Sequence, residues 1–415
     1  MSRIDELIQE FCPDGVEYIT LGETCDIRTG KGITKNDGDA NAMYPIISGG
    51  RAPMGYYHAF NRSENTVTIS RVGANAGHVG FMERKFYLND KCFSVLPKEE
   101  YHNQFNNKFL FYTLKANESN ITGLQSEGGV PTINTTKVSN IWVPKPPIEI
   151  QNEIVKTLDL FTELEAELEA ELEARKTQYT YYRDALLSFE GKEVEWKTLG
   201  TICKNVTSGG TPLANKSEYY NNGTIPWLRT QEVRFIDIYS TEIKITELAL
   251  KQSSAKWIPA NCIIVAISGA TAGRSCINKI PLTTNQHCCN LDIDSSQANY
   301  RYVFHWVCAK YEKLKSLGQG ARADLNSGII KSFPIAVPSL HEQEKIASIL
   351  ENFDSLVNDI SSGLPAEIEA RKKQYEYYRN RLLTFKPIQN SSTAKRNHNA
   401  NFKVVEFDHF KSKAD

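Results

Sequence analysis

Residues 173–183 read EARKTQYTYYR, and residues 369–379 read EARKKQYEYYR, 196 positions later in the chain. A segment of this length does not recur with so few changes by chance. Internal repetition decides the architecture of a protein, because each copy folds as the same structural unit. The two segments therefore indicate that the chain contains a duplicated unit.

Further matches extend the repeat along the chain. They occur in the same order in both copies, at offsets of 178, 196 and 192 residues. The matched segments are VEYITLG at 16–22 with VEWKTLG at 194–200, GANAG at 73–77 with GATAG at 269–273, Asn89 with Asn285, Ile133-Asn134 with Leu325-Asn326, and IEIQ at 148–151 with LHEQ at 340–343. The chain thus consists of two copies of a unit of about 190 residues.

The first part of each copy is predicted to be an α+β domain. Short β-type runs occur at 66–70 and 262–267, and Gly-rich turns bound them. A helical stretch follows in each copy, around 109–114 and 300–317. The second part of each copy is predicted to be a helical arm.

The first arm shows apolar residues at helical spacing from Ile154 to Phe189. A helix from 148 to 188 would be about 60 Å long, which is twice the diameter of a small domain. A long helix with a narrow apolar stripe favours pairing with another helix. The expected partner is the second arm, whose apolar residues run from Ile346 to Phe385.

The two arms differ in their middle part. Residues 164–174 read LEAELEAELEA, a tetrad repeated in strong helix formers. Residues 361–367 of the second arm read SSGLPAE. Gly363 suits the position after a helix end, and Pro365 suits the first turn of a new helix. The second arm is therefore predicted to be two helices placed end to end.

Charge is distributed unevenly along the chain, although the net charge is -1. Residues 146–190 carry 4 basic and 11 acidic groups, whereas residues 191–340 carry 17 basic and 11 acidic groups. Polyanion binding is therefore expected on the globular parts and disfavoured on the first arm. The predicted boundaries are 1–145 for the first domain, 146–190 for the first helix, 191–338 for the second domain, 339–386 for the helix pair and 387–415 for a polar tail.

Composition excludes several classes of protein. No apolar run approaches the ~20 residues of a membrane span, and the N-terminus lacks the apolar core of a signal peptide. The nine cysteines are scattered and form no C-x-x-C pair. We therefore expect a cytoplasmic protein with reduced thiols, without a disulfide framework or a zinc site.

The sequence contains no catalytic motif that we can identify. It lacks a G-x-x-x-x-G-K-[ST] phosphate loop and an N/D-P-P-[FY] run, and the HEQEK segment at 341–345 lacks the second histidine of a zinc-protease helix. The GANAG and GATAG segments miss the G-x-G-x-x-G spacing. They are predicted to be tight turns or, alternatively, loops that face a phosphate backbone. No catalytic residue and no metal ligand is predicted.

Polar residues on Gly-rich loops beside aromatic residues are the best candidates for DNA contact. In the major groove arginine reads guanine and glutamine reads adenine, so both residue types suit base recognition. A solvated surface remains the alternative interpretation for each residue. The candidates are Arg28, Lys31 and Arg71 in the first domain and Arg229, Gln231, Arg274, Gln319 and Arg322 in the second.

The motif Q-Y-x-Y-Y-R at 178–183 and 374–379 allows two compatible interpretations. Its aromatic residues can pack where the two arms meet. They can also form a docking face for partner helices, since tyrosine and arginine are common at interface hot spots. The candidate partner-binding residues are Tyr179, Tyr182, Arg183, Tyr375, Tyr378 and Arg379.

Taken together, these features resemble the specificity (S) subunit of type I restriction-modification systems. The resemblance covers nearly the whole chain and rests on both Tyr-Tyr-Arg motifs, the VEWKTLG segment, the GLPAEIEAR run at 363–371 and the tetrad repeat, which is similar to the type IC branch. It implies an α+β fold with two pseudo-twofold-related target-recognition domains, separated by a long antiparallel coiled coil.

The resemblance also implies a function in DNA recognition. Each domain would read one half of a bipartite, asymmetric site in double-stranded DNA, and the helices would dock two methyltransferase subunits. Motor-nuclease subunits would join for cleavage. The chain itself would hold no cofactor, because S-adenosylmethionine, ATP and Mg²⁺ would bind those partners.

Two other classes of function are left open by the residues alone. One is a self-sufficient DNA methyltransferase or nuclease, which the missing motifs disfavour. The other is a coiled-coil scaffold that binds only proteins. Methyl transfer by the purified chain would favour the first, and salt-sensitive duplex binding in the presence of the partner would exclude the second.

Overall fold

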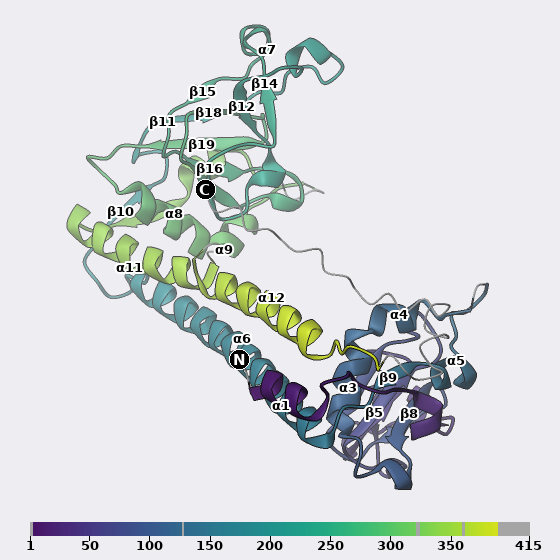
Figure 1. Cartoon of the computed structure of the whole chain (residues 1–415). Coiled ribbons are helices and arrows are strands. Elements are labelled where there is room, and N and C mark those ends of the chain that lie inside the picture. Colours follow the sequence, from purple (N-terminus) through teal and green to yellow (C-terminus); the bar gives the residue numbers. More distant parts are fainter. Residues whose placement is uncertain (1–2, 127, 321–323, 359–361, 389–415) are drawn as a thin grey trace. The chain divides into compact units, whose positions relative to one another are not determined.

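The computed structural model describes residues 3–126, 128–320, 324–358 and 362–388. These residues form two compact units. Unit 1 comprises the described part of Met1–Glu167 and Ile368–Asp415, and unit 2 comprises that of Leu168–Glu367. The long helix α6 (Ile148–Leu186) gives its first half to unit 1 and its second half to unit 2 (Figure 1). Each unit therefore contains one globular domain and parts of the helical arms.

The core of unit 1 lies between an antiparallel sheet, ordered β2–β8–β5–β6, and helix α3. The central strand β5 reads TVTIS and is buried at all five positions, as a strand covered on both faces requires. The elements of its globular domain are β1 (Tyr18–Thr20), α2 (Leu21–Thr24), β2 (Cys25–Thr29), β3 (Tyr44–Ile47), β4 (Gly55–Tyr57), β5 (Thr66–Ser70), β6 (Val79–Met82), β7 (Tyr87–Leu88), β8 (Cys92–Pro97), α3 (Asn107–Ala116), α4 (Glu118–Thr122), α5 (Thr135–Ser139) and β9 (Trp142–Pro144).

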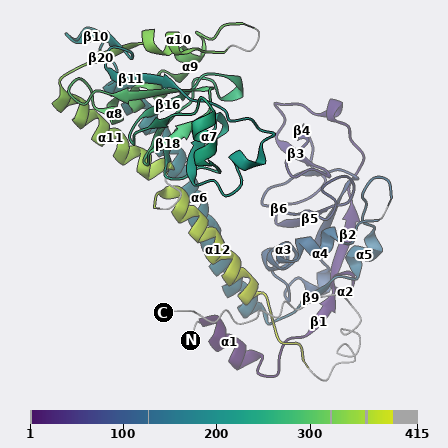
Figure 2. The ribbon, with the colours of Figure 1, turned by 90° about the horizontal axis from the view of Figure 1, so that it is seen from above.

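Unit 2 repeats this plan with a five-stranded sheet, ordered β11–β19–β16–β17–β13, and a second sheet, ordered β14–β12–β18–β15. Helix α8 packs on the arm helix α11 (Leu340–Asn358), as Figure 2 shows. The elements of its globular domain are β10 (Glu195–Thr198), β11 (Cys203–Ser208), β12 (Ile225–Leu228), β13 (Asp237–Ile238), β14 (Ile243–Ile245), α7 (Glu247–Gln252), β15 (Trp257–Ile258), β16 (Ile263–Ala266), β17 (Ser275–Asn278), β18 (Leu282–Thr284), β19 (Cys288–Ile293), α8 (Tyr300–Ala309), α9 (Tyr311–Lys315), α10 (Ser327–Ser332) and β20 (Pro334–Val337).

These elements confirm the predicted secondary structure of both domains. The run at 66–70 is β5, and the run at 262–267 contains β16. The helical stretches are α3 in the first domain and α8 with α9 in the second. The predicted α+β composition is therefore correct in each copy.

The arms pair within each unit, as the apolar stripes predicted. In unit 1, Phe161 of α6 stacks on Tyr378 of α12 (Leu364–Leu382), with ring centroids 5.5 Å apart. In unit 2, Tyr182 of α6 stacks on Phe353 of α11, also at 5.5 Å. Glu165 pairs with Lys372 at 3.5 Å. Going from Phe161 to Glu165 along α6, the contacted residue of α12 changes from Tyr378 to Lys372, so the two helices are antiparallel.

The tetrad segment of α6 is less buried than an uninterrupted coiled-coil seam would be. Leu164 is 39% exposed, and Leu168 and Leu172 are only half-buried. Buried residues of α6 itself end at Leu158. The stripe therefore continues through the tetrads, but it contributes much less buried apolar area there.

The second arm consists of α11 and α12, so two helices end to end were predicted correctly. Pro365 lies in the first turn of α12, and the Gly363 carbonyl accepts hydrogen bonds from the amides of Ala366 and Glu367. Gly363 thus directly precedes α12 and accepts the first hydrogen bonds of that helix. Its predicted position after the end of the preceding helix involves residues 359–361, which lie outside the described ranges.

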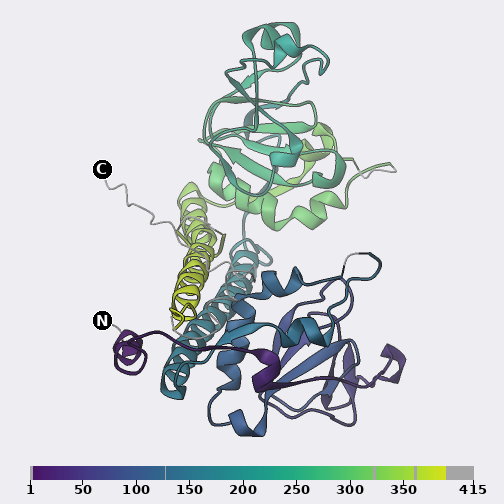
Figure 3. The same cartoon turned by 45° about the vertical axis from the view of Figure 1, so that its right-hand side comes forward.

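Both ends of the described chain are attached to unit 1. Pro387 forms a parallel bridge with Val16, and the Ile388 amide donates to the Val16 carbonyl at 3.2 Å. The rest of the predicted tail, 389–415, lies outside the described residues. The sequence analysis did not predict helix α1 (Arg3–Phe11), which is drawn in purple near the N-terminus in Figure 3. This helix places Ile4 and Leu7 in an apolar cluster with Leu382.

Candidate nucleic-acid interface

Several loops of unit 1 converge around the buried side chain of Asn89. Its Nδ2 donates to the Ile33 carbonyl at 2.8 Å, while its Oδ1 accepts from Ser48 Oγ at 3.2 Å and from the Lys91 amide at 3.0 Å. One amide group therefore ties three chain segments together. We call the assembly of residues 29–33, 48–51, 71–73, 89–91 and 131–133 loop cluster 1.

Loop cluster 1 brings together Lys31 and Arg71, two of the predicted DNA-binding residues. The Lys31 amide donates to Leu88, and the Lys31 side chain is exposed. The Arg71 amide donates to the Lys91 carbonyl, and its guanidinium lies 5.8 Å from the centre of the Phe93 ring. Both cations thus stand on loops whose backbone is fixed by hydrogen bonds.

Unit 2 repeats the turn bond and the backbone hydrogen bonds of this arrangement around Asn285. Its Oδ1 accepts from the His287 backbone amide at 3.2 Å, and its backbone N–H donates to the Leu228 carbonyl at 2.9 Å. The Ile267 amide donates to the His287 carbonyl, and the Leu325 amide donates to the Ile267 carbonyl. Loop cluster 2 accordingly comprises residues 208–212, 228–231, 267–269, 285–287, 319–320 and 324–326.

Arg229 and Gln231 lie in loop cluster 2, but Arg229 is engaged within its own loop. Its Nη2 pairs with Glu242 at 2.8 Å, and its Nε lies 3.8 Å from the buried Glu232. Glu232 in turn accepts from the backbone amides of Arg229 and Glu242. Arg229 therefore supports the loop that presents Gln231, and it would have to exchange these partners to read a base.

The other candidates of the second domain lie at different places. Gln319 exchanges both backbone hydrogen bonds with Asp324 and belongs to loop cluster 2. Arg274 lies beyond the cluster, where its amide donates to the Thr271 carbonyl and its own carbonyl accepts from Ala266. Arg322 lies outside the described residues.

The GANAG and GATAG segments form tight turns, which was the first of their two interpretations. All four glycines have positive φ, between +71° and +104°. A Cβ at Gly77 would contact Thr122 of α4, and one at Gly273 would contact Tyr311 of α9, so these two glycines also permit close packing. Gly73 and Gly269 have open space around a Cβ, which leaves the phosphate-facing interpretation possible for that end of each turn.

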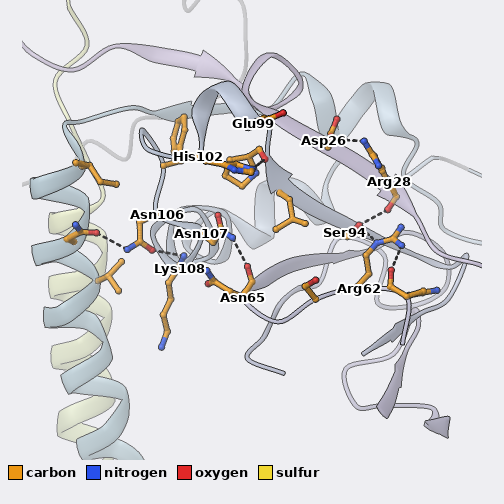
Figure 4. A pocket seen from close by; sticks show the side chains of 18 of the residues that line it. Asp26, Arg28, Arg62, Asn65, Ser94, Glu99, His102, Asn106, Asn107 and Lys108 are labelled. Carbon is orange, nitrogen blue, oxygen red and sulfur yellow. Dashed lines mark hydrogen bonds and ion pairs between the residues drawn. The ribbon is translucent and has the colours of Figure 1, made fainter. Parts of the chain in front are cut away.

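Arg28 lines a separate cavity of about 1220 Å³ in unit 1 (Figure 4). It pairs with Asp26 at 2.8 Å. Arg62, which the sequence analysis missed, lines the same cavity and donates to Ser94 Oγ and to the backbone oxygens of Asn61 and Thr29, all at 2.8 Å. Burial and the nearby Arg28 lower the pKa of the Arg62 guanidinium. Both guanidiniums are therefore already engaged by oxygen acceptors, and the carboxylates of Asp26 and Glu99 line the same cavity.

In both loop clusters a glycine packs directly against a backbone carbonyl, and substituting that glycine tests the cluster. A Cβ at Gly30 would overlap the Leu88 carbonyl, and a Cβ at Gly209 would overlap the Thr284 carbonyl. We expect Gly30→Ala to displace loop cluster 1, to cost roughly 1–3 kcal/mol of stability as overpacking does, and to remove the predicted DNA contact of that cluster. Denaturant unfolding and titration with duplex DNA measure these two effects.

The matched control is Gly32→Ala in the same loop. The nearest atom to its Cβ is Asp90 Cγ at 4.0 Å, an ordinary contact, so this variant should behave like the wild type. Equal behaviour of the two variants would contradict the role of loop cluster 1.

The Q-Y-x-Y-Y-R motifs place their tyrosines on two sides of each helix. Tyr182 and Tyr378 stack on Phe353 and Phe161, and Tyr179 and Tyr375 lie 6.4 Å from the same two rings. These contacts support the arm-packing interpretation for all four residues. Their predicted contact with a partner stays a prediction.

The outer side of each motif presents a tyrosine that the sequence analysis did not select. Tyr181 is 69% exposed and Tyr377 is 60% exposed, at the same offset of 196 residues. Arg183 pairs with Asp184 at 2.8 Å, and Arg379 lies over the Tyr375 ring with 5.6 Å to its centre. The repeat itself was the signal that could have identified this exposed pair.

Metal-ligand clusters, membrane-spanning helices and reactive thiols would indicate other kinds of site. Nowhere in the described ranges do three His, Cys, Asp or Glu side chains gather closely enough to hold a metal ion. None of the helices described combines the length and apolar character that a membrane crossing requires. All nine cysteines are free, and burial raises the pKa of Cys92 to about 12, so its thiol stays protonated.

Comparison with known proteins identifies the family. The family model of the type I restriction modification DNA specificity domain matches residues 13–174 and again residues 191–370. The chain is 44% identical to the EcoR124I/EcoR124II specificity subunit of Escherichia coli, over 58% of this chain and 61% of that protein. It is 32% identical to a protein of Mycoplasma pneumoniae named as a type I specificity subunit, over 82% of this chain and 99% of that protein.

A solved structure shares the fold. The S subunit of a type I restriction-modification system from M. genitalium matches with a TM-score of 0.61 and 16% identity, over 89% of this chain and 96% of that one. The match confirms the predicted fold class, in which two α+β repeats carry long paired helices. The chain belongs to the family of DNA specificity subunits of type I restriction-modification systems.

Proposed function

We propose that loop clusters 1 and 2 each read one half of a bipartite, asymmetric site in double-stranded DNA. The observation that carries this proposal is the repetition of one backbone frame with different side chains on it. The side chains of Asn89 and Asn285 each accept from the amide two residues on. The amides of Arg71 and Ile267 donate to the equivalent carbonyls of Lys91 and His287, whereas the other side chains on these loops differ. Two loop clusters with the same backbone arrangement and different side chains are suited to reading two different DNA sequences.

The side chains of the two clusters differ in their hydrogen-bonding properties. Loop cluster 1 carries the cations Lys31, Arg51, Arg71 and Lys91, whose side chains suit guanine and phosphates. Loop cluster 2 carries Gln231, Gln286 and Gln319, whose amides suit adenine. Different donors and acceptors in the two clusters favour two unlike half-sites.

The arms supply the second part of the proposal, which is the docking of two methyltransferase subunits. The exposed Tyr181 and Tyr377 occur at equivalent positions of the repeat. Exposed tyrosines are typical interface anchors, and duplicated anchors on one chain suit two copies of the same partner. Motor-nuclease subunits would join this assembly for cleavage.

In this proposal the partner subunits carry out methyl transfer and DNA cleavage. S-adenosylmethionine, ATP and Mg²⁺ would bind the other subunits, and the methyltransferase would flip the target adenine out of the helix while this chain holds the flanking duplex. The purified chain alone should therefore bind DNA weakly and transfer no methyl group.

Reconstitution with a methyltransferase subunit of a type I system tests the proposal. The complex should bind duplex DNA in a salt-sensitive manner and methylate a bipartite site, because the chain provides the sequence reading. Tyr181→Ala with Tyr377→Ala should weaken assembly by roughly 1–2 kcal/mol for each tyrosine, measured by titration of the partner.

Two outcomes would contradict the parts of this proposal separately. A complex that assembles but neither binds nor methylates DNA would contradict the assignment to DNA recognition and leave a protein-only scaffold. Unchanged assembly of the Tyr181/Tyr377 variant would place docking elsewhere. The control pair, Tyr182→Ala with Tyr378→Ala, should lower the melting temperature because it removes the stacks with Phe353 and Phe161.

A further inference from the structure

Two fully buried glutamines join the arms to the globular domains, one in each unit. Gln151 is the fourth residue of α6, and Gln343 is the fourth residue of α11. Both side chains are completely inaccessible to solvent. A buried amide is costly unless its donors and acceptor are bonded, so its partners indicate what it holds.

The two glutamines make the same set of hydrogen bonds. In unit 1, Gln151 Nε2 donates to the carbonyls of Gln104 at 2.8 Å and Pro146 at 2.7 Å, and its Oε1 accepts from the Asn106 amide at 2.9 Å. These bonds connect the start of the arm helix with the loop that enters α3.

In unit 2, Gln343 Nε2 donates to the carbonyls of Gln297 at 3.5 Å and Pro338 at 2.8 Å, and its Oε1 accepts from the Asn299 amide at 2.8 Å. Asn106 and Asn299 are the N-cap residues of α3 and α8. Each glutamine therefore attaches an arm helix to the capped end of a helix in its domain.

A second attachment lies further along each arm. Lys108 of α3 pairs with Asp159 of α6 at 3.1 Å and with Glu83 at 3.2 Å, and Figure 4 shows Asn106 and Lys108 on the side of the cavity next to α6. Burial lowers the pKa of Lys108, but its bonds to Asp159 and Glu83 outweigh that effect and raise it.

The equivalent residue of unit 2 is Arg301. Its Nε lies 2.7 Å from Glu351 of α11, and its Nη1 donates to Asp237 of β13 at 2.8 Å. In both units, then, one cation near the start of a domain helix bridges the arm and the globular domain. The charge is the same, although the residue types differ.

Two attachments on one helix define a direction as well as a position. Gln151 and Asp159 are eight residues apart, as are Gln343 and Glu351, which corresponds to about 12 Å along a helix. A helix held at a single point can pivot, whereas one held at two points this far apart cannot pivot without breaking either the buried glutamine bonds or the ion pair.

We propose that Gln151 and Gln343, with the Lys108–Asp159 and Arg301–Glu351 ion pairs, are positioning residues that determine which spacer length between the two half-sites the complex accepts. They fix the direction of each arm helix relative to its own domain, so that the domain cannot reach a half-site at another distance. This inference rests on the proposed function, because it assumes that each domain reads one half-site.

The test uses the complex of the full chain with its methyltransferase partner. The substrates are duplexes that carry the two half-sites methylated by the wild type, with spacers one or two base pairs shorter or longer than the natural one. The measured quantity is the ratio of methylation at the natural spacer to that at its neighbours. The variants are Gln343→Leu, which keeps the side-chain size, and Glu351→Ala, with the exposed Glu344→Ala on the same helix as the control.

We expect the ratio to fall about tenfold in Gln343→Leu, the factor that corresponds to one lost buried hydrogen-bonding partner. It should fall severalfold in Glu351→Ala and stay unchanged in Glu344→Ala. An unchanged ratio in both test variants, with methylation lowered evenly at every spacer, would overturn the proposal and leave a purely structural role.

The two variants give a decisive result even if one of them does not fold, and the wild-type control distinguishes a failure of this inference from a failure of the proposed function. If Gln343→Leu does not fold, Glu351→Ala decides, because that side chain is 41% exposed and its loss is tolerable. If the proposed function itself were wrong, the wild-type complex would already fail to methylate a bipartite site.

Discussion

Exchanging residues 191–338 for the equivalent domain of a relative is expected to replace one half of the methylated sequence and to leave the other half unchanged. All described segments of loop cluster 2 lie within these residues, whereas loop cluster 1 lies within residues 29–133. Each mismatched base pair costs roughly 1–3 kcal/mol, so a few altered contacts suffice for a complete change of one half-site. Methylome sequencing of a host that carries the exchanged chain measures the outcome.

The boundaries of this exchange follow the structure. Strands β10 and β20 pair in full register from Glu195 with Val337 to Thr198 with Pro334, so the exchanged segment carries both ends of a closed strand pair. Gln343 remains on the recipient chain and bonds only to backbone atoms of the domain, so it does not require particular side chains there. A change in both halves of the site would mean that the two domains read DNA jointly.

The repeat and the helical arms could be predicted from the sequence because both depend on local signals. Apolar residues at helical spacing predicted a helix over 148–188, and the observed α6 covers Ile148–Leu186. Gly363 and Pro365 predicted the division of the second arm, since each restricts the backbone wherever it stands. Such signals do not require knowledge of distant contacts.

The residues that hold the site together could not be recognised in this way. Gln151 and Gln343 stand in the first turn of a helix, where a glutamine side chain is ordinarily solvated. Nothing in the neighbouring sequence marks them as buried. Asn89 and Asn285 stand in turns, where asparagine is common for local reasons. Only the folded structure shows that these four side-chain amides are buried. The sequence repeat had nevertheless aligned Gln151 with Gln343 and Asn89 with Asn285.

Arg229 could be recognised as a candidate from the sequence, but its engagement by other residues could not. An arginine on a loop beside a tryptophan is typical of DNA contact, but Glu232 and Glu242 engage its guanidinium. Glu232 is close in sequence, whereas Glu242 reaches Arg229 only through the fold. The charge of a loop residue can be read from the sequence, but its availability depends on partners that the fold brings to it.

The tetrad segment of α6 is suited to measuring the spacer between half-sites. One Leu-Glu-Ala-Glu unit adds four residues, or about 6 Å of helix. Four residues rotate an ideal helix by ~400°, so the apolar face turns by only ~40°. Leu164 is 39% exposed, and the stacks of Phe161 and Tyr182 lie outside residues 164–174. One added tetrad therefore lengthens the helix without removing a major packing contact.

Inserting one tetrad after Glu167 is expected to lengthen the spacer and to preserve both half-site sequences. Duplex DNA advances ~3.4 Å per base pair, so one tetrad corresponds to at most about two base pairs, and inclination of the helix to the DNA axis reduces this toward one. The second arm ends one helix at Asn358 and begins the next at Leu364, so the added length need not be matched within one continuous partner helix. Deleting one tetrad should shorten the spacer equally. Methylome sequencing measures it, and an unchanged spacer in an active complex would show that tetrad number affects only the stability of the arm.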